Sequence, residues 1–362
     1  MKKTIRSYKF YHNSSKAWQA IYQSCRNAKK SIYIEQYIFE ADIVGKSFIK
    51  LLSIKAKQGV KVKVLCDWFG SINLYRSRIP QDFKKDGGEI YFYRPISIWQ
   101  LLRPSTWFPR VHHKLFIIDN KVAYVGSMCL DKSMLDWRDT AIRLNYNTVK
   151  DTVKYFEILW ESCRSRKRPS SLKIELAQQK EFNFYANFPQ DNNYLLCNEV
   201  LNRIHSAKKY IYMASPYFMP TKPFFSALKE AVKRGVEIIL IIPKKYDSPF
   251  VYDLACSYYK EALRSSIKIL RYKADLLHAK YIIIDDNWST LGSLNFDYLS
   301  LRMNNELNVN ISNLKAVAEL KKQCLLDFKK SELVKLSQLM HKTIWRRLLG
   351  LMFRKLKKFI LQ

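Results

Sequence analysis

Two stretches of the sequence carry the same reactive side chains at the same spacing. Residues 112–127 read HHKLFIIDNKVAYVGS, and residues 278–293 read HAKYIIIDDNWSTLGS. Each contains His-x-Lys, an Asp after four further residues, and Gly-Ser beginning seven residues later. The matching positions are His112, Lys114, Asp119, Gly126 and Ser127 in the first stretch and His278, Lys280, Asp285, Gly292 and Ser293 in the second. One copy would be a weak signal, but two copies in register within one chain indicate a duplicated site.

This set of side chains suits the cleavage of a phosphodiester. A phosphodiester is an anion with a poor leaving group, so its site needs positive charge, a nucleophile and an acid for the departing oxygen. One neutral imidazole can attack phosphorus to form a phosphohistidine. The other, when protonated, can give its proton to the leaving oxygen and then act as the base for the incoming hydroxyl. We expect no metal and no cofactor, because the sequence has no separate acidic cluster of the kind that magnesium needs.

The segments around the motifs are predicted to be strands that aim the reactive side chains at one point. Side chains alternate along a strand, so each histidine and the lysine two residues later project from the same face. The apolar residues that follow indicate a buried strand, and the Asp of each motif falls at the hairpin turn after it. Asp119 and Asp285 are therefore either catalytic or structural, and the sequence leaves both readings open. His113 falls on the opposite face and is predicted to be a core residue.

Two further acids are candidates for orienting the histidines. A catalytic histidine needs a fixed orientation and tautomer, which a carboxylate on its second ring nitrogen usually provides. Asp139 follows His112 by 27 residues and Glu306 follows His278 by 28, and both fall on predicted strands. We predict that these acids orient the histidines. The alternative is that they are ordinary surface carboxylates.

The elements that must position the motifs also occur twice. Each half is predicted as a strand–helix–strand unit, then a hairpin that carries the motif, then a long helix. The predicted elements are strands 31–39, 60–66, 209–214 and 236–242 and helices 44–58, 147–163, 222–234 and 313–330. The fold class is therefore α/β, with two mixed-sheet halves packed face to face around the active site. A basic linker near residue 170 separates predicted halves 1–170 and 171–335, and a tail follows at 336–362.

Composition narrows the partners and the compartment. The 63 Lys and Arg oppose 31 Asp and Glu, and the net charge of +32 predicts a polyanionic partner, either nucleic acid or anionic lipid. A merely basic, soluble surface is the alternative. The seven cysteines show no paired spacing, which favours a reducing, cytosol-facing compartment. The basic start of the sequence has no apolar stretch behind it, and no run reaches the ~18 apolar residues of a membrane span. We therefore expect neither export nor membrane spanning.

The chain resembles the phospholipase D superfamily, and within it the bacterial cardiolipin synthases. The resemblance is carried by EQYIF (35–39), GVKVKVLCD (59–67), WRDTAIRL (137–144), SPYFMPT (215–221), LLHAK (276–280) and GSLNFDYLSLRMNNE (292–306). It runs from about residue 10 to residue 330. It implies a duplicated phospholipase D-like fold and a phosphatidyltransferase that joins two phosphatidylglycerol molecules into cardiolipin, releasing glycerol.

The resemblance also implies roles for individual residues. Ser127, Ser293 and Asn295 would bind the phosphate, Asn304 would support the site together with Glu306, and the first histidine would be the nucleophile. The chain departs from the family at Cys129, where Asn is frequent, so the first half is expected to lose one hydrogen bond to the phosphate. We also expect this sequence to contain no paired N-terminal membrane helices of the kind that are common in cardiolipin synthases.

Two segments are candidates for contact with lipid. Residues 341–362 place an apolar stripe along one face of a predicted helix and basic residues elsewhere, a pattern typical of an interfacial helix on anionic lipid. A helix that caps the core is the alternative. Residues 96–109 form an aromatic loop before the first motif, placed either to admit an acyl chain or to pack as an ordinary loop.

Three classes of function remain. A lipid phosphatidyltransferase, peripheral on the inner face of the cell membrane, agrees with the amphipathic tail and the family stretches. A hydrolase would share its first step and differ only in the acceptor. A nuclease is the alternative from another substrate class, because the same chemistry cuts nucleic acid and the net charge of +32 suits a phosphate-tracking groove. A non-catalytic scaffold is disfavoured by the two intact motifs.

Overall fold

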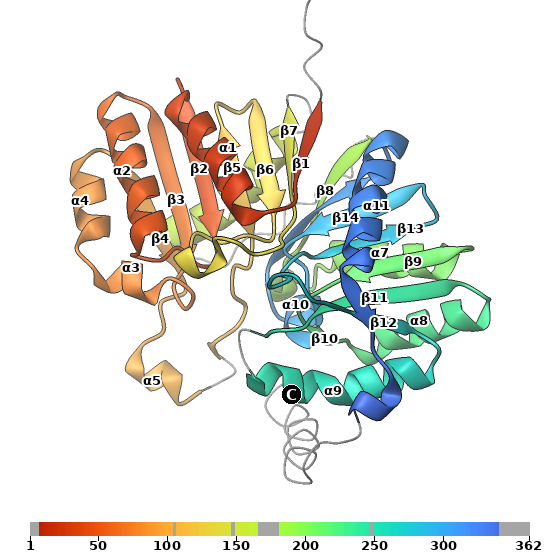
Figure 1. The fold of residues 1–362 in the computed structure, drawn as a ribbon. Coiled ribbons are helices and arrows are strands. Elements are labelled where there is room, and N and C mark those ends of the chain that lie inside the picture. Colours follow the sequence, from red (N-terminus) through yellow and green to blue (C-terminus); the bar gives the residue numbers. More distant parts are fainter. Residues whose placement is uncertain (1–6, 104–105, 146–148, 166–180, 247–248, 340–362) are drawn as a thin grey trace, which may run out of the picture.

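The chain folds into two α/β halves that pack against each other (Figure 1). The structure is a computed structural model that describes residues 7–103, 106–145, 149–165, 181–246 and 249–339. The predicted α/β class with two mixed sheets is confirmed by this architecture. The predicted boundary near residue 170 and the predicted tail helix at 341–362 lie outside the described residues.

Among its described residues, the first half contains a seven-stranded sheet in the order β1-β7-β6-β5-β2-β3-β4. Strands β2, β3 and β4 run parallel, and β5, β6, β7 and β1 are added antiparallel. The strands are β1 (Tyr8–Tyr11), β2 (Ser31–Gln36), β3 (Lys61–Asp67), β4 (Glu89–Tyr93), β5 (Lys114–Ile118), β6 (Val122–Gly126) and β7 (Ala141–Asn145). The helices are α1 (Ser14–Arg26), α2 (Ile43–Lys57), α3 (Ile72–Arg76), α4 (Ile79–Lys85), α5 (Ile98–Leu101), η2 (Lys132–Met134) and α6 (Val149–Ser165).

The part of the second half that the structure describes repeats this plan in an eight-stranded sheet of order β17-β12-β11-β9-β13-β14-β16-β8. Strands β9, β11 and β12 run parallel in it. Its strands are β8 (Phe182–Asn187), β9 (Tyr210–Ala214), β11 (Glu237–Pro243), β12 (Lys268–Tyr272), β13 (Tyr281–Ile284), β14 (Trp288–Gly292), β16 (Glu306–Ile311) and β17 (Ser331–Leu333). A separate pair is formed by β10 (Phe218–Met219) and β15 (Phe296–Asp297). The helices are η4 (Pro189–Asp191), α7 (Leu195–Ser206), α8 (Lys222–Lys233), α9 (Pro249–Arg264), α10 (Tyr298–Arg302), α11 (Leu314–Lys329) and η5 (Leu336–Leu339).

The repeated strand–helix–strand units follow from repeated local signals. The Asp42 side chain caps α2 by accepting hydrogen bonds from the backbone N–H groups at positions 44 and 45. Helices α2 and α8 are both followed by a glycine in the left-handed region, Gly59 with φ +82° and Gly235 with φ +87°. Glycine adopts this conformation without the strain of a Cβ atom, so it ends each helix and turns the chain into the next strand. The similar texts KAKQGV and AVKRGV thus encode the same turn.

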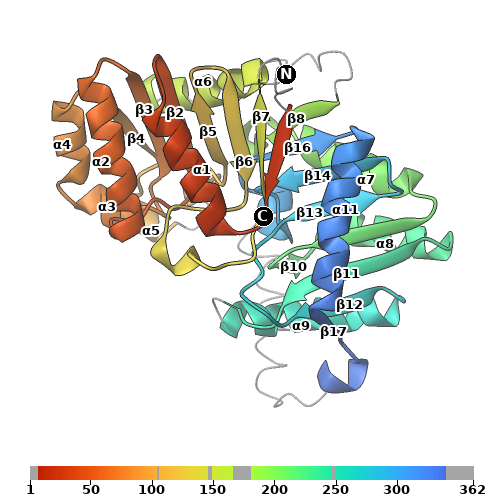
Figure 2. The same ribbon diagram turned by 45° about the horizontal axis from the view of Figure 1, so that its top comes forward.

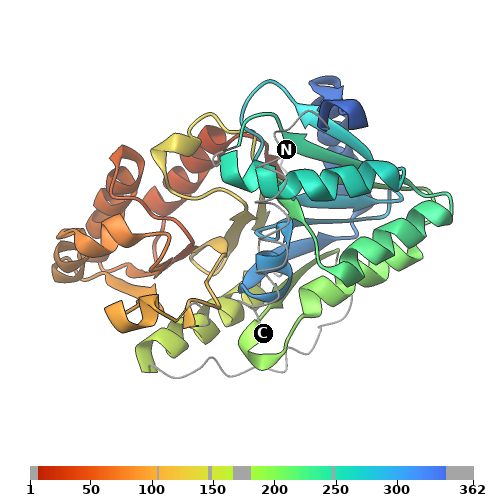
Figure 3. The same cartoon turned by 90° about the horizontal axis from the view of Figure 1, so that it is seen from below.

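The two halves share one apolar core. Its largest cluster combines side chains of β5 and β6 in the first sheet with side chains of β13, β14 and β16 in the second, together with α6 and α11. Figure 2 shows α11 lying across the second sheet. Two further clusters fill the outer layers, under α1 and α2 in the first half and under α7, α8 and α9 in the second. Viewed from below, these outer helices lie on opposite sides of the molecule (Figure 3). The motif hairpins therefore meet where the halves join.

Candidate active site

The two motif histidines lie immediately before strands β5 and β13, and not within strands as the sequence predicts. Each is held instead by the backbone of the other half. The His112 N–H donates to the carbonyl of Asn305 at 3.0 Å, and the His278 N–H donates to the carbonyl of Arg138 at 2.9 Å. Asn305 and Arg138 are the residues that directly precede the two predicted orienting acids. The same backbone contacts therefore place each histidine beside an acid from the opposite half.

The histidine–acid pairs cross between the halves. His112 Nδ1 lies 3.0 Å from the carboxylate of Glu306, and His278 Nδ1 lies 2.9 Å from Asp139 Oδ2. The spacing along the sequence had associated each acid with the histidine of its own motif, and the structure reverses this association. The reason is that Asp139, two residues before β7, and Glu306, the first residue of β16, both lie where the halves face each other. An ionised carboxylate accepts the proton of Nδ1 and so favours the tautomer whose lone pair is on Nε2.

The two motif serines hold the acids in place. Ser127 Oγ donates a hydrogen bond to Asp139 Oδ1, and Ser293 Oγ donates one to Glu306. The Asp139 carboxylate also accepts the backbone N–H of Thr140 at 2.7 Å. A hydroxyl that keeps its proton on a carboxylate has none to give to a phosphate. In the structure both serines therefore support the acids, and the phosphate-binding role implied by the family resemblance stays a prediction.

The motif lysines are buried without a carboxylate partner among the described salt bridges. Lys114 and Lys280 are 3% and 1% exposed. Lys114 Nζ donates to the carbonyl of His112 at 2.7 Å, and Lys280 Nζ lies 2.9 Å from His278 Nε2. Burial lowers the pKa of both lysines, that of Lys280 to about 7. Because a buried ammonium is costly without a counter-charge, these two groups favour the binding of an anion.

Burial also keeps the imidazoles neutral in the empty site. Burial and then the ammonium of Lys114 lower the pKa of His112 well below its usual value. Burial and then Lys280 lower the pKa of His278 to about 4, although the carboxylate of Asp139 opposes this shift. A neutral imidazole keeps a lone pair on one ring nitrogen, so both rings begin in the protonation state that a nucleophile requires.

The two acids differ in their protonation. Burial raises the pKa of Glu306 to about 7. Burial also raises the pKa of Asp139, but the imidazole of His278 and the ammonium of Lys280 outweigh it, and the net pKa falls to about 2. Asp139, beside His278, is therefore fully ionised at neutral pH, whereas Glu306, beside His112, is partly protonated there.

The segment between Ser293 and Glu306 supplies polar side chains around α10. Asn295 and Asn304 are 4% and 8% exposed, and the Oδ1 atom of each has no hydrogen-bond partner in the described structure. A buried amide oxygen without a partner is costly, so these side chains are available to a ligand or to water. Cys129 is buried, and burial raises the pKa of its thiol, so it remains uncharged.

Asp119 and Asp285 lie away from this site, and their nomination as catalytic residues is not supported by their position. Each follows the motif lysine by five residues along a strand, which is roughly 16 Å at about 3.3 Å per residue. Each adopts positive φ and accepts hydrogen bonds from three consecutive backbone N–H groups, at 29–31 for Asp119 and at 208–210 for Asp285. These contacts fix the starts of β2 and β9, so the two acids are structural.

Two buried ion pairs brace the histidine segments and were not singled out from the sequence. Arg110 Nε lies 2.9 Å from Asp67 Oδ2, and Arg138 is bidentate on Asp327 at 3.0 and 2.6 Å. Both arginines lie in stretches that contact the opposite half through the backbone. The only sequence signal was that Asp67 and Arg138 lie in segments that resemble the family.

His113 is fully buried, as the sequence predicts for a core residue. Its Nδ1 atom lies 2.7 Å from Glu35, so this core position holds an acid–histidine pair rather than an apolar contact alone. Both side chains face the core between the halves, away from Lys114. They therefore belong to the packing of the interface.

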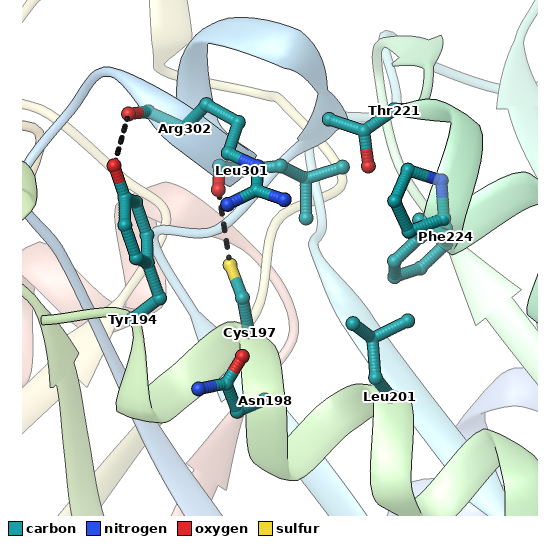
Figure 4. A pocket seen from close by; sticks show the side chains of 9 residues that line it. Tyr194, Cys197, Asn198, Leu201, Thr221, Phe224, Leu301 and Arg302 are labelled. Atoms are coloured by element: carbon teal, nitrogen blue, oxygen red, sulfur yellow. Dashed lines mark hydrogen bonds between the residues drawn. The ribbon is translucent and has the colours of Figure 1, made fainter. Parts of the chain in front are cut away.

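The described residues contain no group of three or more His, Cys, Asp or Glu side chains placed to hold a metal ion. Within the same residues, no helix combines the length and the apolar character needed to cross a bilayer. A small surface pocket lies beside α10 (Figure 4). Its lining combines Tyr194, Cys197, Asn198, Leu201, Thr221, Pro223, Phe224, Leu301 and Arg302. No motif histidine or lysine lines it, so it neighbours the reaction centre without containing it.

Comparison with known proteins agrees with this geometry. A family model described as "Cardiolipin synthase, PLD-like domain" matches residues 21–160 and 200–326. Probable cardiolipin synthase YwiE of Bacillus subtilis is 29% identical over 343 residues, which cover 90% of this chain and 66% of that protein. Cardiolipin synthase 1 of Staphylococcus epidermidis is 30% identical over 337 residues, covering 90% and 68% respectively. The chain spans about two thirds of the length of these relatives.

Solved structures show the same fold at low identity. Phosphatidylserine synthase of Haemophilus influenzae superposes with a TM-score of 0.78 at 14% identity, over 98% of this chain and 93% of that one. Polyphosphate kinase of Porphyromonas gingivalis gives a TM-score of 0.60 at 14% identity, over 89% and 50%. Together with the family match over both halves, this confirms the resemblance drawn from the motifs: the chain belongs to the phospholipase D-like cardiolipin synthase family.

Proposed function

We propose that the protein is a phosphatidyltransferase that converts two phosphatidylglycerol molecules into cardiolipin and glycerol. The observation that carries this proposal is the pair of buried histidines, each with a carboxylate of the other half on Nδ1. The names of the relatives support the choice of lipid. The chemistry needs only the side chains described above, with the phosphodiester of the lipid bound between the two lysines.

In the first half-reaction, His112 Nε2 attacks the phosphorus of one phosphatidylglycerol. The bond from phosphorus to the glycerol oxygen breaks, and protonated His278 gives its proton to that oxygen, so neutral glycerol leaves. His278 suits the acid role because its partner Asp139 is fully ionised, which favours an imidazolium once the anionic substrate has bound. The product of this step is a phosphatidyl group on His112.

In the second half-reaction, the free glycerol hydroxyl of another phosphatidylglycerol attacks the phosphohistidine. Neutral His278 takes the hydroxyl proton, the bond between phosphorus and His112 Nε2 breaks, and cardiolipin forms. Lys114 and Lys280 balance the negative charge on the non-bridging oxygens in both steps. His112 and His278 are 9% and 7% exposed, and a site that excludes water in this way favours transfer to a lipid hydroxyl over hydrolysis.

The proposal includes the location of the enzyme. Both substrates reside in a bilayer, and the net charge of +32 favours attachment to anionic phospholipid. We therefore place the protein peripherally on the inner face of the cell membrane. The predicted tail helix at 341–362 would add to this attachment, although it lies outside the described residues.

The test is to incubate the full chain with phosphatidylglycerol vesicles and to identify the products by mass spectrometry. The matched blank is a variant in which both motif histidines are replaced by alanine. Cardiolipin together with glycerol supports the synthase, whereas phosphatidic acid as the only product would make the enzyme a hydrolase. Unchanged lipids combined with degradation of single-stranded DNA would replace the proposal by a nuclease, the alternative that the basic charge allows.

A further inference from the structure

A loop beside the active site carries exposed apolar side chains at its tip. The loop lies between β4 and the first motif and includes α5. Ile98, Trp99 and Leu102 are 74%, 77% and 78% exposed. Figure 1 shows α5 standing out from the body of the first half, below α3. Single exposed apolar residues are common, but a cluster of three large ones marks a surface that contacts something other than water.

The tip is held in shape by hydrogen bonds within the loop. The backbone N–H of Ser97 donates to Gln100 Oε1 at 2.9 Å, and Trp107 Nε1 donates to the Gln100 carbonyl at 3.0 Å. The N–H of Arg103 also donates to this carbonyl at 3.0 Å. Polar groups of the loop are thus hydrogen-bonded to one another, while the apolar side chains at the tip remain exposed. A tip that is already folded loses little conformational entropy when it docks.

Arg110 ties both ends of the loop to the reaction centre. Its guanidinium donates to the carbonyl of Tyr93 at 2.7 Å and to that of Trp107 at 3.3 Å, which closes the base of the loop. The carbonyl of Arg110 accepts the N–H of Asn305 at 2.8 Å, and His112 follows two residues later. Arg110 therefore fixes the loop that carries the exposed tip next to His112 and the active site.

The loop that carries the tip has basic side chains and no acidic ones. The sequence from residue 90 to residue 118 contains no Asp or Glu, and it exposes Arg94 and Arg103 beside the apolar tip. The segment at residues 68–81, which contains α3 and the start of α4, also has no acidic residue of its own and exposes Phe69 by 51%. Apolar side chains flanked by two arginines are complementary to an anionic lipid surface, where the apolar side chains enter the acyl boundary and the guanidinium groups meet phosphate.

We infer that residues 94–103 and 106–110 form a membrane-docking loop that inserts Ile98, Trp99 and Leu102 into an anionic phospholipid bilayer. This inference rests on the proposed function, because a phosphatidyltransferase must draw two lipids from a bilayer. Docking through this loop sets the wall of the active site against the membrane surface. Phosphatidylglycerol then reaches His112 without passing through water.

The test compares two matched pairs of substitutions in the full chain. Ile98→Ser with Leu102→Ser removes the apolar tip. Ile54→Ser with Leu314→Ser is the control, because these residues are also exposed, at 45% and 64%, but lie toward the end of α2 and at the start of α11. Both control positions lie at the ends of the strands opposite the active site. Helix α2 leads back to the start of β3, and α11 follows the end of β16 that is far from Glu306.

Binding is measured by co-sedimentation with vesicles of phosphatidylglycerol and phosphatidylcholine. We expect the tip pair to bind about tenfold more weakly than the parent, because two apolar side chains no longer enter the bilayer, and the control pair to stay within about twofold. Trp99→Ala should weaken binding in the same direction. Binding by the tip pair that equals that of the parent would overturn the docking loop, as would an equal loss in the control pair.

Activity on two forms of substrate separates docking from chemistry. The tip pair should lose activity on vesicles but retain it on short-chain phosphatidylglycerol dissolved as monomers. An equal loss on both forms would mean that the loop supports the site itself, and the inference would then fail. If the parent protein is inactive on both forms, the proposed function fails, while the vesicle-binding result still decides whether the loop docks. A parent dimer that the tip pair cannot form, with unchanged vesicle binding, would assign the tip to a second copy of the chain instead.

Discussion

The two half-sites share their geometry and differ in their charge. In each, a histidine is bonded through Nδ1 to an acid from the opposite half, and a serine hydroxyl donates to that acid. Yet the pKa of Glu306 is raised by burial to about 7, whereas that of Asp139 falls to about 2 because nearby cations outweigh burial. A duplicated site can therefore have equivalent residues at equivalent positions and still give its two histidines different roles, because the protonation of each acid depends on its surroundings.

Replacing the histidines should have the largest effect and should expose this division. His112→Ala and His278→Ala are each expected to lower turnover of phosphatidylglycerol by at least about 10³-fold. The first variant loses the nucleophile, and the second loses the group that gives and takes the proton. A phosphodiester with a p-nitrophenol leaving group needs no acid, so His278→Ala should still form the covalent adduct with it. Mass spectrometry of the intact protein detects the adduct. Adduct formation by His112→Ala would reverse the two roles.

Neutralising the acids should have unequal effects. Asp139→Asn replaces an ionised carboxylate and is expected to lower turnover by roughly 10²–10³-fold, since His278 then loses the charge that stabilises its protonated form. Glu306→Gln replaces a group that is already partly protonated near neutral pH, and a loss of about tenfold is expected. The measurement is the turnover number at saturating lipid. Equal losses in the two variants would show that the charge difference has no catalytic consequence.

The same asymmetry should appear in the pH dependence of stability. Glu306 keeps its proton up to about pH 7 in the folded chain but only to about 4.3 when unfolded, so the folded state binds more protons and loses stability as the pH rises through this window. Glu306→Gln cannot titrate. As the pH rises from 4.5 to 8, the free energy of unfolding of Glu306→Gln should therefore increase relative to that of the parent by up to about 3 kcal/mol.

Asp139→Asn provides the contrast for that experiment. The pKa of Asp139 is depressed to about 2, so its contribution to stability is present above about pH 4 and is lost only as the pH falls toward 2. Its difference from the parent should stay flat between pH 4.5 and 8. Urea denaturation at several pH values measures both curves, and parallel curves for the two variants would contradict the assigned protonation states.

The smallest effect on activity is expected at the aspartates that end each motif. Asp119→Asn and Asp285→Asn weaken hydrogen bonds to the backbone at the starts of β2 and β9, and each should cost about 1–2 kcal/mol of folding free energy. Turnover should remain within about twofold of the parent, because neither group reaches the histidines. Thermal denaturation and a standard activity assay check the two parts. A loss of activity without a loss of stability would return these residues to the catalytic set.

The sequence predicted the duplication, the order of helices and strands along the chain around each motif, and the family, because these depend on local patterns that occur twice. It did not predict that the acids cross between the halves. Chain distance linked Asp139 with His112, but the actual pairing depends on how the two sheets face each other, which no local pattern encodes. The sequence also left the motif aspartates undecided, since a side chain at a hairpin turn has the same spacing whether it reacts or bonds to backbone. The ion pair of Arg138 with Asp327 joins residues 189 positions apart, beyond any local signal.

The crossed acids make each half dependent on the other. A single half, taken alone, would present its histidine without an acid and its acid without a histidine. Two identical halves related by a two-fold axis would complete both pairs, as an isologous dimer does. The chain thus has the geometry of a homodimer whose subunits have been fused. Fusion removes the demand that both subunits be identical, and so one polypeptide can keep Asp in one half-site and Glu in the other.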